Sequence, residues 1–529
     1  MRVGSVFISS LFFGICSILK QNLPSMKICT RIPGLFQAGG SLPGRLLLPL
    51  LIPAFTLLVS CREPEPEKPY NVLMICVDDL RPELGCYGNE TIRSPHIDRL
   101  AASGLVFDNH YVQCAACGPS RSMLLTSRIG TKWSPWNRYR NMEEEPGHAI
   151  AMPHLFRRNG YTTVCVGKVS HKPGGVMDSA QLEPEIPFAW DTTFAEVGKW
   201  GTPIKSFFGF ADGGYHNRFV YPDSEPRIPY EAGDVGDTGY PDGLNARSAV
   251  KQLERLSEGE QPFFLAVGFY KPHLPFNAPK KYWDLYERQA IPMADNDYPP
   301  KNLGNPWAVH TSYEVTTHYH WPDGEGNIND EQARALKHGY YACVSYTDAQ
   351  IGLLLDALEE SGVSDNTIVL LWGDHGWQLG EHDIFGKQTN FDIATRSPLI
   401  FRVPGMTGRG ERAAGFVETL DIYPTLTELC GLEAPGDLQG SSFTSILKDP
   451  SEEGKPRVRS FFKRDSVMGK TICTDRYRLV RWKTEGGETV GLELYDHRND
   501  PGENVNVASR YPAVTDSLES VLDRAVFFE

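Results

Sequence analysis

The chain has 529 residues, of which 41% are apolar and 22% are charged, and its formal net charge at pH 7 is −14. This length suits one large domain with a smaller one, or two to three ordinary domains, and the composition is that of a globular protein. The acidic balance argues against non-specific binding to nucleic acid or to anionic bilayers. Eleven scattered cysteines are too few for a disulfide scaffold.

An apolar stretch near the N-terminus predicts export. Residues 46–59 are apolar, but this stretch is too short and too interrupted by proline to span a membrane comfortably. Its length and composition suit the apolar region of a signal peptide. The segment Leu58–Cys61 looks like a bacterial lipobox, and residues 62–69 are typical of an extended, charged tether. We therefore expect an exported lipoprotein, anchored through Cys61 in the periplasm or on the cell surface. An ordinary cleaved signal is the alternative.

Two continuous apolar runs predict central parallel strands, and each run leads into a pair of potential metal ligands. Residues 71–77 end in the pair Asp78–Asp79, and residues 366–372 are followed by Asp374–His375. Open α/β sheets place their ligands at the carboxyl ends of the strands, and adjacent carboxylates repel each other unless a cation lies between them. A cation site is therefore predicted at this edge. A solvated turn is the alternative.

The stretch Cys117-Gly-Pro-Ser-Arg places a thiol at the start of a predicted helix. Pro119 fits the first turn of a helix, so the thiol should lie beside the positive helix end, which attracts anions and lowers a thiol's pKa. Arg121 lies one helical turn beyond Cys117, so its guanidinium can point at the same oxyanion. A buried free cysteine before a capped helix is the alternative.

Two further predicted strands lead into basic residues. Residues 162–167 precede Lys168 and His171, whose side chains share a face if a helical turn follows. Residues 262–268 precede His273, which lies between two prolines in a stiff loop.

The remaining pattern predicts an α/β fold in which helices sandwich a large, mostly parallel sheet. Residues 174–239, rich in glycine, proline and aromatic residues, are expected to form long loops. Short alternating strands and a final amphipathic helix follow a boundary around residues 435–455 and predict a small antiparallel sheet with a helix. The predicted helices are 94–102, which Ser94 is expected to cap, 243–256, 331–361, a segment starting at 420, and 511–526. The predicted parts are an export segment (1–61), a tether (62–69), a catalytic domain (70–447) and a C-terminal subdomain (456–529).

The motifs resemble those of the type I sulfatases of the alkaline phosphatase superfamily. The segment C-x-P-S-R-x-x-x-L-T is typical of that family, although Ser127 stands where the family usually has glycine. The order V-D-D, C-x-P-S-R, G-K-x-x-H, K-P-H, G-D-H-G and G-K covers nearly the whole mature chain and is highly specific. Residues 77–88, 266–276 and 374–382 are similar to the iduronate-2-sulfatase group of the family. The resemblance implies an alkaline phosphatase-like fold.

The resemblance also implies the chemistry. In the family, a formylglycine-generating enzyme oxidises the cysteine to formylglycine, an aldehyde whose hydrate is the nucleophile. The implied cation is Ca²⁺, with Mg²⁺ as the alternative. The implied metal ligands are Asp78, Asp79, Asp374, His375 and the modified Cys117. The implied chemical roles are charge stabilisation by Arg121 and Lys168, protonation of the leaving group by His273 with Lys387, and proton removal by His171.

The implied substrate is a sulfated oligosaccharide or polysaccharide, with 2-O-sulfate on a uronate or a related sugar as the target. Trp133, Trp136 and Arg138 correspond to a substrate-pocket loop, where aromatic rings stack on sugars and arginine can clamp a uronate carboxylate. A surface loop with core tryptophans is the alternative for these residues. For the whole chain, the alternatives are a phosphodiesterase or phosphatase of the same superfamily and a non-catalytic, glycan-binding surface lipoprotein.

Overall fold

The computed structural model describes residues 68–129, 150–178, 183–186, 188–322, 324, 326 and 328–527. All of them belong to one compact unit, Pro66–Glu529. The predicted lipidation site Cys61 and the predicted substrate residues Trp133, Trp136 and Arg138 lie outside the described residues. Within the described part of the chain, every helix is too short or too polar to cross a membrane.

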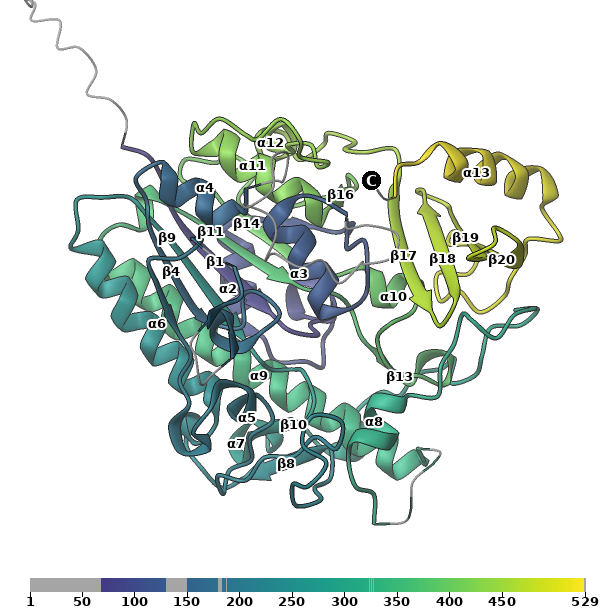
Figure 1. The fold of residues 1–529 in the computed structure, drawn as a ribbon, viewed down its shortest axis with the longest axis horizontal. Coiled ribbons are helices and arrows are strands. Elements are labelled where there is room, and N and C mark those ends of the chain that lie inside the picture. Colours follow the sequence, from purple (N-terminus) through teal and green to yellow (C-terminus); the bar gives the residue numbers. More distant parts are fainter. Residues whose placement is uncertain are drawn as a thin grey trace, which may run out of the picture. The chain divides into compact units, whose positions relative to one another are not determined.

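An eight-stranded sheet forms the centre of the structure, in the order β15-β2-β14-β11-β1-β9-β4-β7 (Figure 1). Strand β14 runs antiparallel to β11 and to β2, and the other neighbouring strands pair in parallel. The central strands are buried along their whole length, which explains their continuous apolar sequences. The strands are β1 (Asn71–Val77), β2 (Leu105–Phe107), β4 (Thr162–Gly167), β7 (Thr192–Phe194), β9 (Phe263–Phe269), β11 (Thr367–Gly373), β14 (Leu399–Arg402) and β15 (Glu411–Ala413).

Helices cover both faces of this sheet, because successive side chains of a strand point to opposite faces. Leu73 and Ile75 of β1 pack with α2 (Pro95–Ser103), α6 (Pro241–Ser257) and α9 (Asp330–Glu360) in one core cluster. Val72 and Met74 pack in the opposite cluster, whose helices are α3 (Cys117–Thr126), α4 (Met152–Arg158), α11 (Ile422–Leu429) and α12 (Thr444–Lys448). The predicted helix–sheet–helix sandwich is confirmed.

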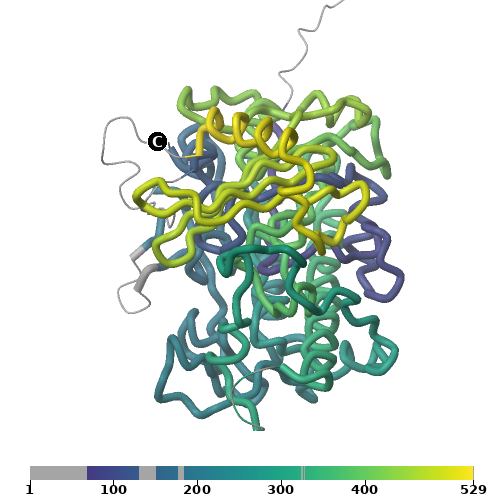
Figure 2. Tube along the Cα trace, turned by 90° about the vertical axis from the view of Figure 1, so that its right-hand side faces the viewer, coloured from purple at the N-terminus to yellow at the C-terminus, as the bar shows by residue number. Residues whose placement is uncertain are grey.

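A four-stranded antiparallel sheet follows at the C-terminus, where the prediction of a smaller sheet with a helix is also confirmed (Figure 2). Leu518 and Leu522 of the last helix share a core cluster with Phe461 and Ile472 of the sheet. The first strand of this sheet was not predicted, and the domain boundaries at residues 447 and 456 stay predictions. The elements are β17 (Val458–Arg464), β18 (Val467–Cys473), β19 (Tyr477–Thr484), β20 (Thr489–Asp496) and α13 (Pro512–Arg524).

Short elements fill the segments between the central strands, including the region that was expected to be loops only. The short helices are α5 (Pro203–Phe207), α7 (Lys280–Trp283), α8 (Tyr313–His318) and α10 (Asp392–Thr395). The short strands are β3 (His110–Tyr111), β5 (Val176–Asp178), β6 (Glu183–Pro184), β8 (Tyr230–Gly233), β10 (Phe276–Pro279), β12 (Gln378–Leu379), β13 (Phe385–Gly386) and β16 (Val417–Glu418).

Candidate active site

Three carboxylates meet where β1 and β11 end. The two strands are parallel neighbours with Val77 opposite Gly373, so Asp78, Asp79 and Asp374 follow side by side. One oxygen of each carboxylate lies within 4.8 Å of the others, and all three residues are fully buried. The backbone amide of Asp79 also donates a hydrogen bond to Asp374 Oδ1 (2.9 Å). The predicted convergence of the two strand ends is therefore found.

The thiol of Cys117 lies against this group at the first turn of α3. Its Sγ is 3.3 Å from Lys387 Nζ, 3.4 Å from His375 Nε2 and 3.9 Å from Asp79 Oδ1. Burial raises the pKa of Cys117 well above its ordinary value, and the negative charge of Asp78 adds to that shift. The expected lowering of this pKa by the helix end is therefore wrong, because desolvation and the nearby carboxylates outweigh the helix dipole.

Arg121 and Lys168 bind the carboxylates of Asp78 and Asp374. Arg121 donates from Nε to Asp374 Oδ2 (2.9 Å) and from Nη2 to Asp78 Oδ1 (3.2 Å). Lys168 donates to the other oxygen of Asp78, and its ammonium group lies 4.2 Å from the centre of the Phe207 ring. Both cations are buried, so they neutralise and orient the carboxylates.

His273 and Lys387 lie beside the third carboxylate, that of Asp79. Lys387 Nζ lies 2.8 Å and 3.0 Å from the two oxygens of Asp79. His273 Nε2 is 3.9 Å from Asp79 Oδ2 and 3.4 Å from Glu314 Oε1. Its Nδ1 lies 2.6 Å from the carbonyl oxygen of Leu274, which can only accept, so we assign the proton of that hydrogen bond to Nδ1. Nε2 is thereby directed toward the carboxylates.

A cavity of about 760 Å³ opens beside Cys117. His171, His273 and Lys387 line it, and so does Glu314 of α8. The expected helical turn after Lys168 is absent, since residues 168–172 form bends, and His171 nevertheless reaches the cavity wall. The end of β17 and the turn that follows it also line the cavity, through residues 462–465. The cavity is therefore lined both by residues near the strand ends of the eight-stranded sheet and by residues of the C-terminal sheet.

The carboxylates suit a divalent cation. Burial raises the pKa of Asp374 to about 7, and repulsion from Asp78 contributes. Burial likewise raises the pKa of Asp79 well above its usual range, although Lys387 opposes the shift, whereas Lys168 and Arg121 overcome burial and hold the pKa of Asp78 low. The three buried carboxylates repel one another when all are ionised, and a cation between them would remove that repulsion. His375 Nε2 lies 3.4 Å from Asp79 Oδ1, and together these groups form an oxygen-rich donor set that fits Ca²⁺ or Mg²⁺.

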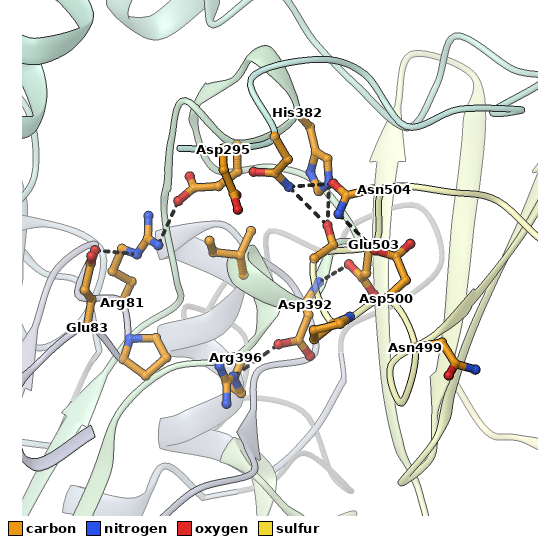
Figure 3. Close-up of a pocket in the computed structure, with 16 residues that line it drawn as sticks. Arg81, Glu83, Asp295, His382, Asp392, Arg396, Asn499, Asp500, Glu503 and Asn504 are labelled. Atoms are coloured by element: carbon orange, nitrogen blue, oxygen red, sulfur yellow. Dashed lines mark hydrogen bonds and ion pairs between the residues drawn. The ribbon is translucent and has the colours of Figure 1, made fainter. Parts of the chain in front are cut away.

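A second cavity, of about 560 Å³, does not include any of the predicted site residues (Figure 3). Several of its charged side chains form ion pairs: Arg81 with Glu83 and Glu381, and Arg396 with Asp392. This cavity lies along the loop 499–504, which follows the C-terminal sheet. Its described lining residues include no cysteine, serine or threonine, so the cavity beside Cys117 is the candidate active site.

Glu314 and Phe207 belong to the site, although the sequence motifs do not indicate either of them. Glu314 lies in a stretch without clear periodicity, and nothing in its local pattern indicates that it reaches His273. Phe207 lies in the region expected to be loops, yet its ring contacts both Lys168 (4.2 Å) and His273 (4.7 Å between ring centres). Both residues reach the site only through the tertiary fold.

A mostly parallel α/β sheet whose strand ends hold buried carboxylates beside a cysteine is a fold that this chain shares with solved hydrolases. Among solved structures, a phosphonate monoester hydrolase of Agrobacterium radiobacter shares the fold (TM-score 0.67, 22% identity, 86% of this chain and 95% of that chain). A 2-O GAG sulfatase does so too (TM-score 0.62, 23% identity, 86% of this chain and 91% of that chain).

The sequence comparisons narrow this class to a family. Residues 70–432 match the family model described as "Sulfatase", and residues 380–526 match "N-sulphoglucosamine sulphohydrolase, C-terminal". The human protein named iduronate 2-sulfatase is 35% identical over 426 residues, which are 75% of this chain and 74% of that protein. A sulfatase of Formosa agariphila is 31% identical over 503 residues, or 88% and 90% of the two chains. The chain therefore belongs to the sulfatase family, and it is a sulfuric ester hydrolase.

Proposed function

We propose that this enzyme removes a 2-O-sulfate from a uronate, or from a related sugar, of a sulfated polysaccharide. The observation that supports this proposal is the position of Cys117, buried among carboxylates and cations at the wall of a large cavity. The named activities of the human iduronate 2-sulfatase and of the 2-O GAG sulfatase point to the same class of substrate.

The reaction adds water across a sulfate ester and yields the sugar hydroxyl and hydrogen sulfate. The hydrate of a formylglycine at position 117 would supply the nucleophilic oxygen, and a cation held by Asp78, Asp79, Asp374 and His375 would neutralise sulfate oxygens. Other residues act around these groups. Arg121 and Lys168 hold Asp78 and Asp374 in place through their hydrogen bonds, and they favour the ionised form of Asp78.

Two histidines at the cavity wall are assigned to the proton transfers of the reaction. We assign His273, supported by Lys387, to protonation of the departing sugar oxygen: with Nδ1–H held by Leu274, the imidazolium form would donate its second proton from Nε2, which lies at the boundary between the carboxylates and the cavity. We assign His171 to removal of a proton from residue 117 as sulfate leaves. Both residues line the cavity together with position 117.

Arg464 supports a substrate that carries a carboxylate. Its guanidinium lines the cavity and donates to the carbonyl oxygens of Trp307 (2.9 Å) and Gln388 (2.7 Å). No carboxylate forms an ion pair with it among the described residues. Burial lowers its pKa, but arginine stays charged in proteins, so a fixed positive charge faces the bound sugar. A uronate carboxylate matches that charge.

The test is sulfate release from a panel of 2-O-sulfated uronate oligosaccharides, with a phosphodiester and a phosphonate monoester included. We expect sulfate release by the wild-type enzyme and none by Cys117→Ala. The intact mass of the peptide that contains residue 117 should show formylglycine, which is lighter than cysteine. Turnover of the phosphorus esters alone, with an unmodified Cys117, would instead establish the phosphodiesterase alternative.

We further propose that the protein is exported and anchored by a lipid on Cys61, and that a formylglycine-generating enzyme matures it. The lipobox-like segment and the tether support the anchor. Labelling of cells with a radioactive fatty acid should mark the wild-type protein but not Cys61→Ala.

A further inference from the structure

We propose that Phe219, stacked on His318, forms a binding platform for the sugar next to the sulfated one. This inference rests on the proposed function, because it places the sulfated sugar beside Cys117 and asks where the rest of the chain lies. It names a specificity residue that the motifs do not contain. The ligand is a second pyranose ring, so the substrate is an oligosaccharide and not a single sulfated sugar.

Phe219 is unusually exposed for a phenylalanine that lines an active-site cavity. Its side chain is 80% exposed, and it lines the same cavity as Cys117 and His273. One face of its ring stacks on His318, with the ring centres 5.4 Å apart and the planes 17° from parallel. The high exposure leaves the other face free. A single exposed apolar side chain is common on protein surfaces, so its place in the cavity is the informative observation.

The loop that carries Phe219 is held in place. The side-chain oxygen of Asn217, a buried residue, accepts hydrogen bonds from the amides of Phe219 and Val220, both at 3.0 Å. The amide of Arg218 donates to the carbonyl oxygen of His318 (2.9 Å), which joins the loop to the end of α8. The ring of Phe219 is therefore exposed in a fixed position, which lowers the entropic cost of binding a ligand there.

The same loop is connected to the catalytic groups. Tyr221 packs against the aromatic cluster of Phe207, Phe208 and Tyr270. The ring of Phe207 in turn contacts His273 (4.7 Å between ring centres). These contacts fix the loop of Phe219 relative to His273, the residue assigned to protonation of the leaving group.

Helix α8 gives the spacing between the platform and the chemistry. Glu314 and His318 are four residues apart, so they lie on the same side of the helix, separated by about 6 Å along its axis. Glu314 contacts His273, and His318 carries the platform. We therefore infer that the sugar next to the sulfated one lies over Phe219.

The chemistry of the platform selects a sugar. The face of a pyranose ring that carries its C–H bonds is apolar and packs on an aromatic ring, while the hydroxyl groups at its edge stay in water. Burial lowers the pKa of His318, so the imidazole beneath Phe219 is neutral near pH 7 and does not add a charge to the stack. The charged groups of the substrate would instead be bound by the catalytic groups and by Arg464.

The test compares a 2-O-sulfated uronate monosaccharide with the same residue linked to glucosamine in a disaccharide. We expect Phe219→Ala to lower kcat/KM for the disaccharide by about five- to tenfold, and for the monosaccharide by less than about twofold. Phe219→Trp keeps an aromatic face and should retain the wild-type ratio of the two substrates. Phe188→Ala is the matched control, because Phe188 is also exposed (59%) but does not line the cavity.

Equal losses on the two substrates, or an unchanged disaccharide rate, would overturn the platform. A second readout separates this failure from failure of the proposed function. Calorimetry measures disaccharide binding to Cys117→Ala with and without Phe219→Ala, so it does not need turnover. If the wild-type enzyme releases no sulfate, the proposed function fails; weaker binding without Phe219 still supports the platform, and binding that is equal or absent in both variants rejects it.

Discussion

Arg121 connects two of the three carboxylates of the active site through one planar side chain. Its Nε and Nη2 groups reach Asp374 and Asp78 at the same time, and the residue is fully buried. A lysine has a single donor atom and cannot bridge both carboxylates with that geometry. The guanidinium is therefore a structural part of the catalytic centre.

Arg121→Lys should impair both folding and activity. We expect a loss of about 3 kcal/mol in the free energy of unfolding, because one buried carboxylate is left without its partner. We expect sulfate release to fall by about a hundredfold or more, since the carboxylates lose their fixed arrangement. Urea unfolding and the rate of sulfate release measure the two effects.

Arg412→Lys is the control for this experiment. Arg412 pairs with Asp108 at the surface, where the two side chains are 44% and 30% exposed. Such pairs contribute less than about 1 kcal/mol. Equal effects of the two substitutions would contradict the role of Arg121.

Removal of divalent cations should destabilise the protein. Without a cation, Asp79 and Asp374 are buried next to Asp78, and the pKa values of Asp79 and Asp374 are raised for that reason. A cation at a hundredfold excess over its Kd stabilises the folded state by about 3 kcal/mol. We expect EDTA to lower the melting temperature and Ca²⁺ or Mg²⁺ to restore it, and Asp79→Asn to reduce the difference. An unchanged melting temperature, with no calorimetric binding of either ion, would exclude a cation site.

The sequence predicted the residues that follow strongly patterned strands, and it missed those that arrive from elsewhere. Asp78 and Asp374 directly follow buried strands, so a local pattern locates them. Glu314 and Phe219 reach the cavity from short helices and loops whose positions depend on the packing of the whole chain. The raised pKa of Cys117 was also out of reach, because it depends on burial and on carboxylates from other elements.

At the scale of elements, helix α2 shows how a cap can come from a distant residue. The sequence favoured Ser94 as the N-terminal cap, but its side chain accepts a hydrogen bond from the amide of Gly85. The amides of His96 and Ile97 instead donate to Asp348 of α9, at 3.0 Å and 2.7 Å. The expected cap is wrong, because a tertiary partner satisfies the helix amides.

Asp348→Ala should therefore destabilise the protein by about 1 to 2 kcal/mol, the usual cost of a lost cap. Urea unfolding measures it. Ser103→Ala at the other end of α2 is the control, since its hydroxyl only bonds carbonyl oxygens of its own helix. A cost for Asp348→Ala no greater than that of the control would show that α2 does not need this cap.

Long elements were predictable and short ones were not. The buried strands β1, β4, β9 and β11 and the helix α9 agree with their predicted ranges to within one or two residues, because long apolar runs and helical periodicity are strong signals. Strands of three residues, such as β2 and β15, are too short to show a period. The direction of β14 was also unpredictable, because strand direction depends on the path of the chain and not on composition.

At the scale of the whole molecule, buried charges join the C-terminal sheet and the loop after it to helix α10, which precedes β14 of the eight-stranded sheet. Glu503 accepts hydrogen bonds from the amide of Asp392 in α10 and from His497 Nε2, and it forms an ion pair with Arg478 Nε; each distance is 2.7 Å (Figure 3 shows the contact between Glu503 and Asp392). Arg478 also binds Asp392 at 2.6 Å. These contacts connect residues that are far apart in the sequence.

The contribution of His497 to stability should depend on pH. Burial opposes its charged form, but hydrogen bonds with Cys473 and Glu503 raise the pKa of His497 to about 10. A histidine in the unfolded chain has a pKa of about 6.5, so this contribution is complete below pH 6.5 and is lost as the pH rises toward 10.

His497→Gln should consequently cost about 2 kcal/mol at pH 6 and progressively less up to pH 10. Urea unfolding at pH 6, 8 and 9.5 measures the trend. His320→Gln, at an exposed position, is the control and should show no such trend. A cost that stays constant with pH would contradict the assigned charge.

The turn between β17 and β18 has a consequence for how such enzymes diversify. Together with the end of β17, this turn lines the cavity through residues 462–465, which lie more than three hundred positions after residue 117 in the sequence. Exchanging this hairpin for that of a relative should retune which glycans are accepted while leaving bond cleavage intact. Selectivity and reactivity would then be inherited as separate modules of one polypeptide.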